Sequence, residues 1–564
     1  MRLRTVGLGW ALALLLLPAA AAERPNILVI LADDLGYSDL GCYGGEIATP
    51  RLDALAGSGL RFTQCYNSSR CCPSRASLLT GLTAHQAGIG HFVGQGDHPG
   101  YLGRLADHTA TLAEVLRPAG YATLAAGKWH VNEPGPVARG FDEFYGFLHG
   151  YAVDAYDPRM MVRQPAGRSE RAYPEGEYYA THAITDHALD FLDIARSQAR
   201  PWLLYVAYQC PHFPVQSPPT ASRKYLPVYE RGWDALRAER LGRMQALGLV
   251  PAAVPLPPRE MIDSPDVARR LGSLTSDGRN PAWESLSSAR QADLAHRMAT
   301  YAAAVELMDA DIGRLVDSLV AHDEFTNTLI LFLSDNGACG EWELFGFDLD
   351  ATDSPSKPRG YGVDGATPGK PNVLHEGDSL AEMGGPGSWF SYGCGWANLC
   401  NTPLARYKHF AHEGGIRTPL VVHWPAVIRE AGGWRRDVVH LMDVMATCVE
   451  VAGARYPPPQ VGHKLLPLEG RSLVPTLAAD TGSPRTLVFE HERHGAIRRG
   501  DWKLVARDAI DHEGLRPAVR WELYDLAADP SEQHDLAATH PQLVDDLAAE
   551  FLTEARRTLI LPRP

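Results

Sequence analysis

Residues 26–34 read N-I-L-V-I-L-A-D-D, an unbroken run of apolar and mostly branched side chains that ends in two aspartates. Such a run predicts a strand buried on both faces, the kind of strand that parallel sheets contain. The same pattern recurs at 328–336 (T-L-I-L-F-L-S-D-N) and at 202–212 (W-L-L-Y-V-A-Y-Q-C-P-H). Ligands of open α/β sheets bind beyond the carboxyl ends of the strands. We therefore expect the polar residues at these three ends to converge: Asp33, Asp34, His212, Asp335 and Asn336.

A long amphipathic helix precedes the strand at 328. Its apolar residues recur at steps of four and three: Leu294, Met298, Tyr301, Val305, Met308, Ile312, Leu315 and Leu319. A helix followed by a buried strand predicts an α/β sandwich around a large, mostly parallel central sheet. The stretches 214–290, rich in Pro, Arg and Glu, and 345–400, rich in Gly and Pro, are predicted to be long excursions that border the site.

The pattern changes near residue 485, where the runs become short. Segments at 486–490, 495–499, 502–505 and 521–526 predict a small antiparallel sheet, and 541–560 predicts a helix that lies on it. We therefore expect a large domain over 23–484 and a small C-terminal subdomain over 485–564.

The charge and the first residues limit the classes of function. Lys and Arg number 53 and Asp and Glu 67, for a formal net charge of −14, which argues against a nucleic-acid binder. Residues 1–22 contain two arginines, a short apolar run and then small alanines, which predicts a cleaved signal peptide and export to the periplasm or the medium. The alternative is an uncleaved membrane anchor. No later stretch approaches the roughly 20 apolar residues that span a bilayer, so we expect no membrane span in the mature chain. Disulfides are permitted in such a compartment but cannot be assigned from sequence.

The segment 71–81 reads C-C-P-S-R-A-S-L-L-T-G, with Pro73 positioned to start a helix and Gly81 to end it. Cys71 would then lie at a helix N-terminus, which favours anions. The segment resembles the cysteine-type signature of the sulfatase family, C-x-P-S-R-x-x-x-L-T-G. G-Y-A-T-L-A-A-G-K-W-H at 120–130 is similar to a second signature of the family, and the segments at 406–419 and 502–530 are similar to its later parts. The stretch 391–402 is closest to the larger bacterial arylsulfatases.

This resemblance implies an alkaline-phosphatase-like fold and a modification that the sequence does not display. Cys71 would be oxidised to formylglycine by a formylglycine-generating enzyme, whereas Cys72 lies one residue too early in the signature. A thiolate that attacked a sulfate ester would be trapped as a covalent product, whereas the hydrated aldehyde can release sulfate. The alternative is a buried or disulfide-bonded cysteine pair without catalytic function.

The resemblance also implies a divalent metal ion. Its ligands would be the formylglycine at Cys71 and the oxygen atoms at two strand ends: Asp33, Asp34, Asp335 and Asn336. Oxygen ligands favour Ca²⁺, with Mg²⁺ as the alternative, over zinc. Taken alone, an aspartate pair after a strand is a common helix cap or solvated turn.

The remaining catalytic roles follow from charge. Arg75 would contact the hydrate, while Lys128 and Lys408 would neutralise the sulfate oxygens. His212, together with Lys408, would protonate the departing alcohol, and His130 would accept a proton. Either histidine has a structural role as its alternative. Four further histidines are also candidates to face the pocket: His85, His91, His409 and His412. Three tryptophans, Trp129, Trp389 and Trp396, are expected to pack in the core rather than to contact an aryl group.

These inferences predict an exported, metal-dependent sulfuric ester hydrolase of the arylsulfatase type, which would act on a small-molecule or glycan sulfate ester. The enzymatic alternative is a phosphodiester or phosphonate monoester hydrolase that uses the same site. An alternative of another class is a non-catalytic binder of sulfated glycans, if Cys71 is unmodified. Aryl, alkyl and sugar sulfates all stay open as substrates.

Overall fold

The structure is a computed structural model that describes residues 24–150, 154–262, 277–340, 344–348, 374–458 and 464–564. The predicted leader at 1–22 lies outside these residues, as do parts of both predicted excursions. In the described chain, a ten-stranded sheet forms the centre of the fold. Its strands, in spatial order, are β10 (Val439–His440), β2 (Leu60–Tyr66), β8 (Arg417–His423), β7 (Thr328–Ser334), β1 (Asn26–Asp33), β6 (Trp202–Pro211), β3 (Ala122–Lys128), β4 (Glu143–Phe147) and β5 (Val162–Gln164), with β9 (Gly433–Arg435) beside β2.

The middle of this sheet is parallel, as predicted. Strands β7, β1, β6, β3 and β4 all run in one direction, and the antiparallel pairings involve β8 and β5. β1 is buried along seven of its eight residues. Its side chains alternate between two cores: Leu28 and Ile30 belong to one, while Ile27 and Val29 belong to the other. Burial on both faces explains the unbroken apolar run that the sequence shows.

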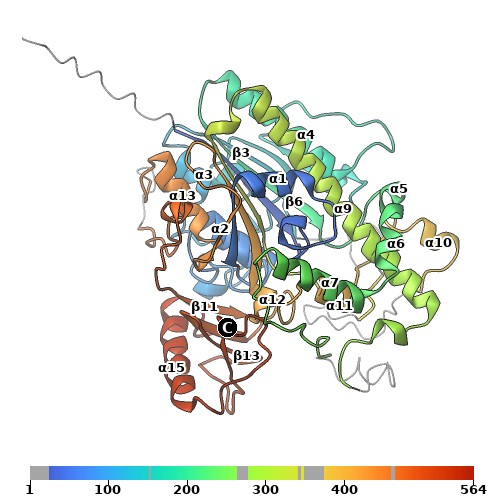
Figure 1. Ribbon diagram of the computed structural model, residues 1–564. Helices are drawn as coiled ribbons and strands as arrows, with labels where there is room; N and C mark the ends of the chain where they lie inside the picture. The colour runs from blue at the N-terminus through green and yellow to red at the C-terminus, as the bar shows by residue number, and fades with distance from the viewer. Residues whose placement is uncertain (1–23, 151–153, 263–276, 341–343, 349–373, 459–463) are drawn as a thin grey trace, which may run out of the picture.

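Helices cover both faces of the sheet (Figure 1). The core on one face includes residues of α1 (Pro50–Ser58), α4 (Ala180–Ser197), α7 (Trp233–Ala246) and α9 (Ser288–Ala321). The core on the other face includes residues of α2 (Cys71–Thr80), α3 (Leu112–Leu116) and α13 (Asp443–Ala452). The short helices of the described chain are α5 (Pro219–Ser222), α6 (Leu226–Tyr229), α10 (Asp378–Ala381), α11 (Cys394–Cys400), α12 (Glu413–Ile416) and α14 (Val474–Ala478).

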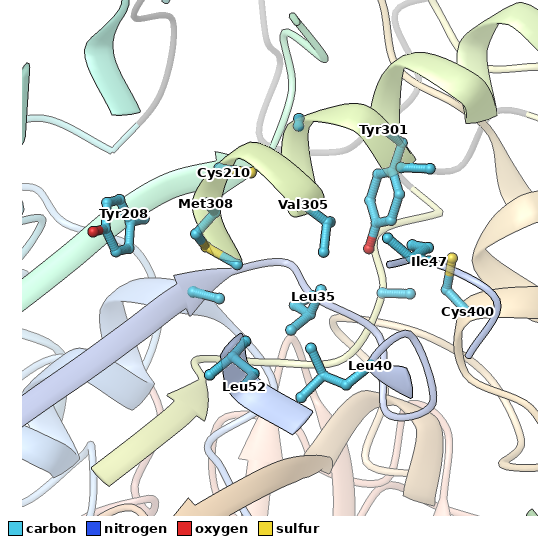
Figure 2. Packing of buried hydrophobic residues seen from close by; sticks show 14 of the residues in the cluster. Leu35, Leu40, Ile47, Leu52, Tyr208, Cys210, Tyr301, Val305, Met308 and Cys400 are labelled. Carbon is cyan, nitrogen blue, oxygen red and sulfur yellow. The ribbon is translucent and has the colours of Figure 1, made fainter. Parts of the chain in front are cut away.

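The long helix α9 confirms the predicted stripe, because all eight apolar residues of that stripe are buried. Figure 2 shows Tyr301, Val305 and Met308 directed from α9 toward Leu35 and Leu40, which follow β1. This packing fixes the loop that leaves the carboxyl end of β1, the end at which Asp33 and Asp34 lie.

A second sheet of four antiparallel strands follows, as predicted. It consists of β11 (Thr486–His491), β12 (His494–Arg499), β13 (Trp502–Ala506) and β14 (Glu522–Asp525). The helix α15 (Pro541–Arg557) covers one face of this sheet, where Phe551 packs with Ile497 and Leu504. On the other face, Val505 and Tyr524 share a core with Tyr66 and Ile416 of the large unit.

Two local features differ from the expectations. The helix at the cysteine signature begins at Cys71, two residues before Pro73. The excursion at 214–290 contains the 14-residue helix α7. Its buried face includes Arg240, which forms ion pairs with Asp39 (2.8 Å) and Glu46 (2.5 Å). Because part of this face is charged, the apolar periodicity that indicates a helix is weak in the sequence.

Candidate active site

Cys71 is the first residue of helix α2 and is 2% exposed. All ten residues of the helix are buried, and the helix ends at Gly81, whose φ of +71° is in the left-handed region that favours glycine. Because the first backbone N–H groups of a helix have no partners within it, this end favours an anion. Neither Cys71 nor Cys72 forms a disulfide.

The carboxyl ends of β1 and β7 lie side by side, since Ala32 pairs with Ser334 in register. The residues that follow are therefore in contact. The backbone N–H of Asp34 donates to Asp335 Oδ1 (3.2 Å), and Asn336 Nδ2 donates to Asp34 Oδ1 (2.6 Å). All four polar residues that were predicted to meet here are at most 1% exposed.

Three cations face these carboxylates. Lys128 Nζ lies 2.5 Å from Asp33 Oδ2, and Lys408 Nζ lies 3.1 Å from Asp34 Oδ2. Arg75, one turn after Cys71 on α2, places Nη2 at 2.7 Å from Asp335 Oδ2 and at 3.5 Å from Asp33 Oδ1. An unpaired charge is costly when it is buried. Because each cation contacts at least one carboxylate, these ionised groups can all be buried at one site.

Lys128 owes its position to the glycine before it. Gly127, in β3, has a φ of +104°, and a Cβ atom there would lie 1.9 Å from the carbonyl oxygen of Ala207 in β6. Only glycine permits this approach of the two backbones. The G-K-W-H segment of the sequence therefore contains a packing requirement as well as charged groups.

The two predicted histidines occupy different surroundings. His212 follows the end of β6, and its Nε2 lies 3.5 Å from both Asp34 Oδ2 and Lys408 Nζ. His130 has a φ of +51°, and neither of its ring nitrogens has a hydrogen-bond partner among the residues that the structure describes. The His130 ring packs edge-on against Phe92, with the ring centroids 5.3 Å apart.

The ionisation of the site follows from burial and charge. Burial by itself would raise the pKa of Asp33, but Lys128, His212 and Arg75 outweigh it and hold that pKa below its usual value. Burial and the charge of Asp33 raise the pKa of Asp335. Burial, followed by Lys128 and Arg75, depresses the pKa of His130 well below its usual value. Burial also raises the pKa of the Cys71 thiol, so the unmodified side chain is a neutral thiol at pH 7.

The donor atoms fit a divalent cation. One ligand atom from each of Asp33, Asp34, Cys71 and His212 lies within 4.8 Å of the others. Within the described chain, Asp33 Oδ1 and Asn336 Oδ1 accept no hydrogen bond although both are buried. Buried oxygen atoms without donors are costly, and a hard cation would satisfy them. Asp335 lies beside this group, with both of its oxygens in contact with Arg75 or the Asp34 backbone.

The four further candidate histidines contact the C-terminal sheet. His85 lies 2.8 Å from Glu490, His409 lies 3.3 Å from Glu492, and His412 lies 3.2 Å from Glu522. The ring of His91 is 5.4 Å from that of His491. Sequence reasoning did not single out these partners, although the run F-E-H-E-R-H at 489–494 is unusually rich in ionisable residues for the end of a strand.

The tryptophans pack in the core, as expected. Trp129 packs edge-on against Phe141, and Trp396 packs against Trp233 and Trp283. Trp389, the most exposed of the three, is 8% exposed.

Comparison with known proteins identifies the family. Residues 25–454 match the family model described as Sulfatase, and residues 406–557 match the model described as N-sulphoglucosamine sulphohydrolase, C-terminal. The chain is 31% identical to an uncharacterized sulfatase of Schizosaccharomyces pombe over 97% of this chain and 96% of that protein. It is 33% identical to an arylsulfatase of Klebsiella aerogenes over 81% of this chain and 92% of that protein.

A solved structure has the same fold. The crystal structure of Ps i-CgsB in complex with k-i-k-neocarrahexaose superposes with a TM-score of 0.60 at 24% identity, over 94% of this chain and 93% of that one. The similarity confirms the predicted alkaline-phosphatase-like α/β fold.

Proposed function

This chain belongs to the sulfatase family and hydrolyses sulfate esters, and we propose that the buried group around Cys71 carries out that reaction. One observation carries the proposal. The cysteine of the signature lies at a helix N-terminus, with ligand atoms of Asp33, Asp34 and His212 within 4.8 Å of its sulfur and of one another. A nucleophile, anion-stabilising N–H groups and a cation site thus meet at one buried point.

Cys71 is proposed to be converted to formylglycine by a separate maturation enzyme. The neutral, buried thiol is a weak nucleophile, because the thiolate is the reactive form. The hydrated aldehyde would supply the attacking oxygen and permit release of sulfate. Cys72, the second residue of α2, does not share this position, since its side chain belongs to the hydrophobic core on that face of the large sheet.

The cation is proposed to be Ca²⁺, with Mg²⁺ as the alternative, held by Asp33, Asp34, Asp335, Asn336 and residue 71. When bound, it would polarise the sulfate group toward attack. The oxygen-rich donor set supports a hard cation. Because three carboxylates already face three buried cations, the site is balanced in charge before any divalent ion or sulfate enters.

The remaining side chains are assigned by position. Lys128 and Lys408 neutralise the sulfate oxygens, and Arg75 orients residue 71 while it holds Asp335. His212 Nε2, with Lys408 Nζ beside it, protonates the departing ester oxygen. His130 carries a neutral ring, and neither of its nitrogens has a hydrogen bond to the residues that the structure describes, which suits a proton acceptor.

Sulfated glycans and aryl sulfates are the proposed substrates. Ps i-CgsB was crystallised with a neocarrahexaose, and one relative is an N-acetylglucosamine-6-O-sulfatase.

We also propose export through the leader at 1–22. No helix among the described residues is both long and apolar enough to cross a membrane.

Mass analysis of residue 71 together with turnover tests this function. Active protein should yield a tryptic peptide 71–75 in which residue 71 carries an aldehyde that reacts with a hydrazide probe. The protein should release sulfate from an aryl sulfate or a sulfated carrageenan oligosaccharide faster than it cleaves the matching aryl phosphonate. Active protein with sulfur still on residue 71 would refute the mechanism, and faster phosphonate cleavage would refute the sulfatase assignment.

Two cysteine variants supply the matched pair. Cys71→Ala should lower turnover by at least about 10⁴-fold, because it removes the covalent nucleophile. Cys72→Ala should retain the aldehyde and most of the turnover, at a stability cost of about 1 kcal/mol for a small buried cavity. Equal losses in the two variants would contradict the assignment of Cys71.

A further inference from the structure

A second group of metal-ligating side chains lies where the C-terminal sheet meets the large unit. One ligand atom from each of His91, His491 and Glu492 lies within 4.8 Å of the others. His91 belongs to the loop that follows α2, whereas His491 ends β11 and Glu492 occupies the turn into β12. The group shares no residue with the catalytic centre.

The hairpin turn directs Glu492 toward the two imidazoles. Glu492 and Arg493 have φ values of +49° and +71°, the left-handed conformation of a two-residue hairpin turn whose twist matches that of the strands. The pairing of His491 with His494 closes the hairpin directly before and after this turn. The short, tight turn therefore fixes the carboxylate next to His491, with Glu492 Oε1 3.6 Å from His491 Nε2.

Three ring nitrogens of the two imidazoles have no hydrogen bond to the described residues. His491 is fully buried, and neither of its ring nitrogens makes a hydrogen bond to the described residues. His91 Nδ1 is likewise buried and accepts no hydrogen bond from the part of the chain that the structure describes. A buried nitrogen without a partner costs free energy that a metal ion would recover. Burial lowers the pKa of His491 to about 3 and lowers that of His91, so both rings are in the neutral form that ligates metals.

The Glu492 carboxylate is accessible to solvent but already paired with a cation, which limits the affinity of the site for a metal ion. The Glu492 side chain is 19% exposed, which leaves a route from solvent. Arg70 Nη1 donates to Glu492 Oε1 at 2.9 Å, and His409 Nδ1 lies 3.3 Å from Glu492 Oε2. Because Arg70 already neutralises the carboxylate, we expect reversible binding rather than a permanently filled structural site.

We propose that His91, His491 and Glu492 bind one divalent transition-metal ion of the Zn²⁺ class. Two imidazoles and one carboxylate are a donor set that Zn²⁺ and Co²⁺ use, whereas Ca²⁺ prefers oxygen ligands alone. The bound ion would join the β11–β12 hairpin to the loop after α2. Arg70, which contacts Glu492, is the residue directly before Cys71, so the ion would stiffen the wall of the catalytic centre.

The test is titration of the purified chain with Co²⁺ in the presence of millimolar Ca²⁺, which is added to fill the proposed oxygen-rich catalytic site. The wild-type protein should bind one Co²⁺ with visible d–d absorption, and Zn²⁺ should displace it and raise the melting temperature. His491→Gln and Glu492→Gln should each weaken Co²⁺ binding by at least about tenfold. Removal of a group that only orients a metal ligand already weakens metal binding by about tenfold or more, and removal of the ligand itself should weaken it at least as much.

The matched control is His423→Gln. His423 is also buried, and both of its nitrogens lack hydrogen bonds within the described chain, but it lies at the end of β8 and stacks on Phe325. Its substitution should leave Co²⁺ binding unchanged. Absence of Co²⁺ binding to the wild-type protein, or equal binding to wild-type, His491→Gln and Glu492→Gln proteins, would overturn the proposal. Neither readout requires the aldehyde or turnover, so the proposed function and this site fail independently.

Discussion

At the scale of single residues, Asp34 contacts both a residue that follows β7 and the cation Lys408. Its side chain accepts from Asn336 Nδ2 at 2.6 Å and from Lys408 Nζ at 3.1 Å, and its φ of +66° turns the chain immediately after β1. The sequence predicted which residues would meet here, because strand ends and the signature mark them. It did not predict that His212 Nε2 would lie 3.5 Å from both Asp34 Oδ2 and Lys408 Nζ. These distances depend on the conformation of loops.

Removal of one carboxylate should expose the metal dependence. Asp34→Asn should lower Ca²⁺ affinity by at least about tenfold and turnover with it, because a charged ligand becomes neutral. Metal content per chain, measured after chelation and Ca²⁺ re-addition, checks this. The control is Asp309→Asn, a buried aspartate that accepts from the backbone N–H groups of Arg51 and Leu52, away from the site. Unchanged metal content in Asp34→Asn would remove Asp34 from the ligand set.

At the scale of elements, the approach of β3 to β6 positions Lys128. The two strands are parallel and in register from Ala122 to Gly127. The sequence predicted Lys128 as a functional residue from the resemblance alone. The need for glycine at 127 became visible only when β6 was placed beside it.

Gly127→Ala should therefore impair both folding and activity. The added Cβ would meet the Ala207 carbonyl oxygen, and moving the strands apart should cost about 1–3 kcal/mol and shift Lys128 from Asp33. Urea unfolding and turnover measure the two effects. Gly120→Ala is the matched control, because Gly120 also has a positive φ (+94°) but its Cβ would approach only Arg24, at 3.5 Å. Equal effects of the two substitutions would show that backbone conformation, not strand contact, is responsible.

At the scale of the whole molecule, ionic and apolar contacts join the C-terminal sheet to the large unit. Lys503, in β13, lies 2.9 Å from Glu413 of α12 and 2.8 Å from Glu532, all of them buried. The interface also includes the pairs of His85 and His412 with acidic residues of the small sheet. The boundary near residue 485 stays a prediction, and these contacts indicate that the two parts support each other.

Buried neutral histidines should make the stability of the whole molecule depend on pH. Burial lowers the pKa of His423 to about 4, from an unfolded value near 6.5. Between these values the unfolded chain binds more protons, so the contribution is full above pH 6.5 and is lost as the pH falls toward 4. His423→Phe should therefore lose about 2–3 kcal/mol less stability than the wild-type protein between pH 7.5 and pH 4.5.

Urea unfolding at the two pH values checks this expectation. His322→Gln, a substitution at an exposed histidine at the end of α9, is the control and should follow the wild-type pH dependence. An identical loss of stability in His423→Phe and wild-type protein would contradict the assignment of His423 as a buried, neutral group.

The sequence by itself determined the three central strands β1, β6 and β7, the long helix α9, the C-terminal sheet and the residues at the strand ends. A strand buried on both faces and a helix buried along one stripe each show a pattern of apolar residues within a short stretch of sequence. Gly and Asp at the ends of helices and strands are likewise visible within such a stretch. The tertiary structure alone decided the charge partners of the active-site cations, the helix α7 and the meeting of His91 with His491 and Glu492. These features join residues tens to hundreds of positions apart, and their distances depend on register and packing that no local pattern specifies.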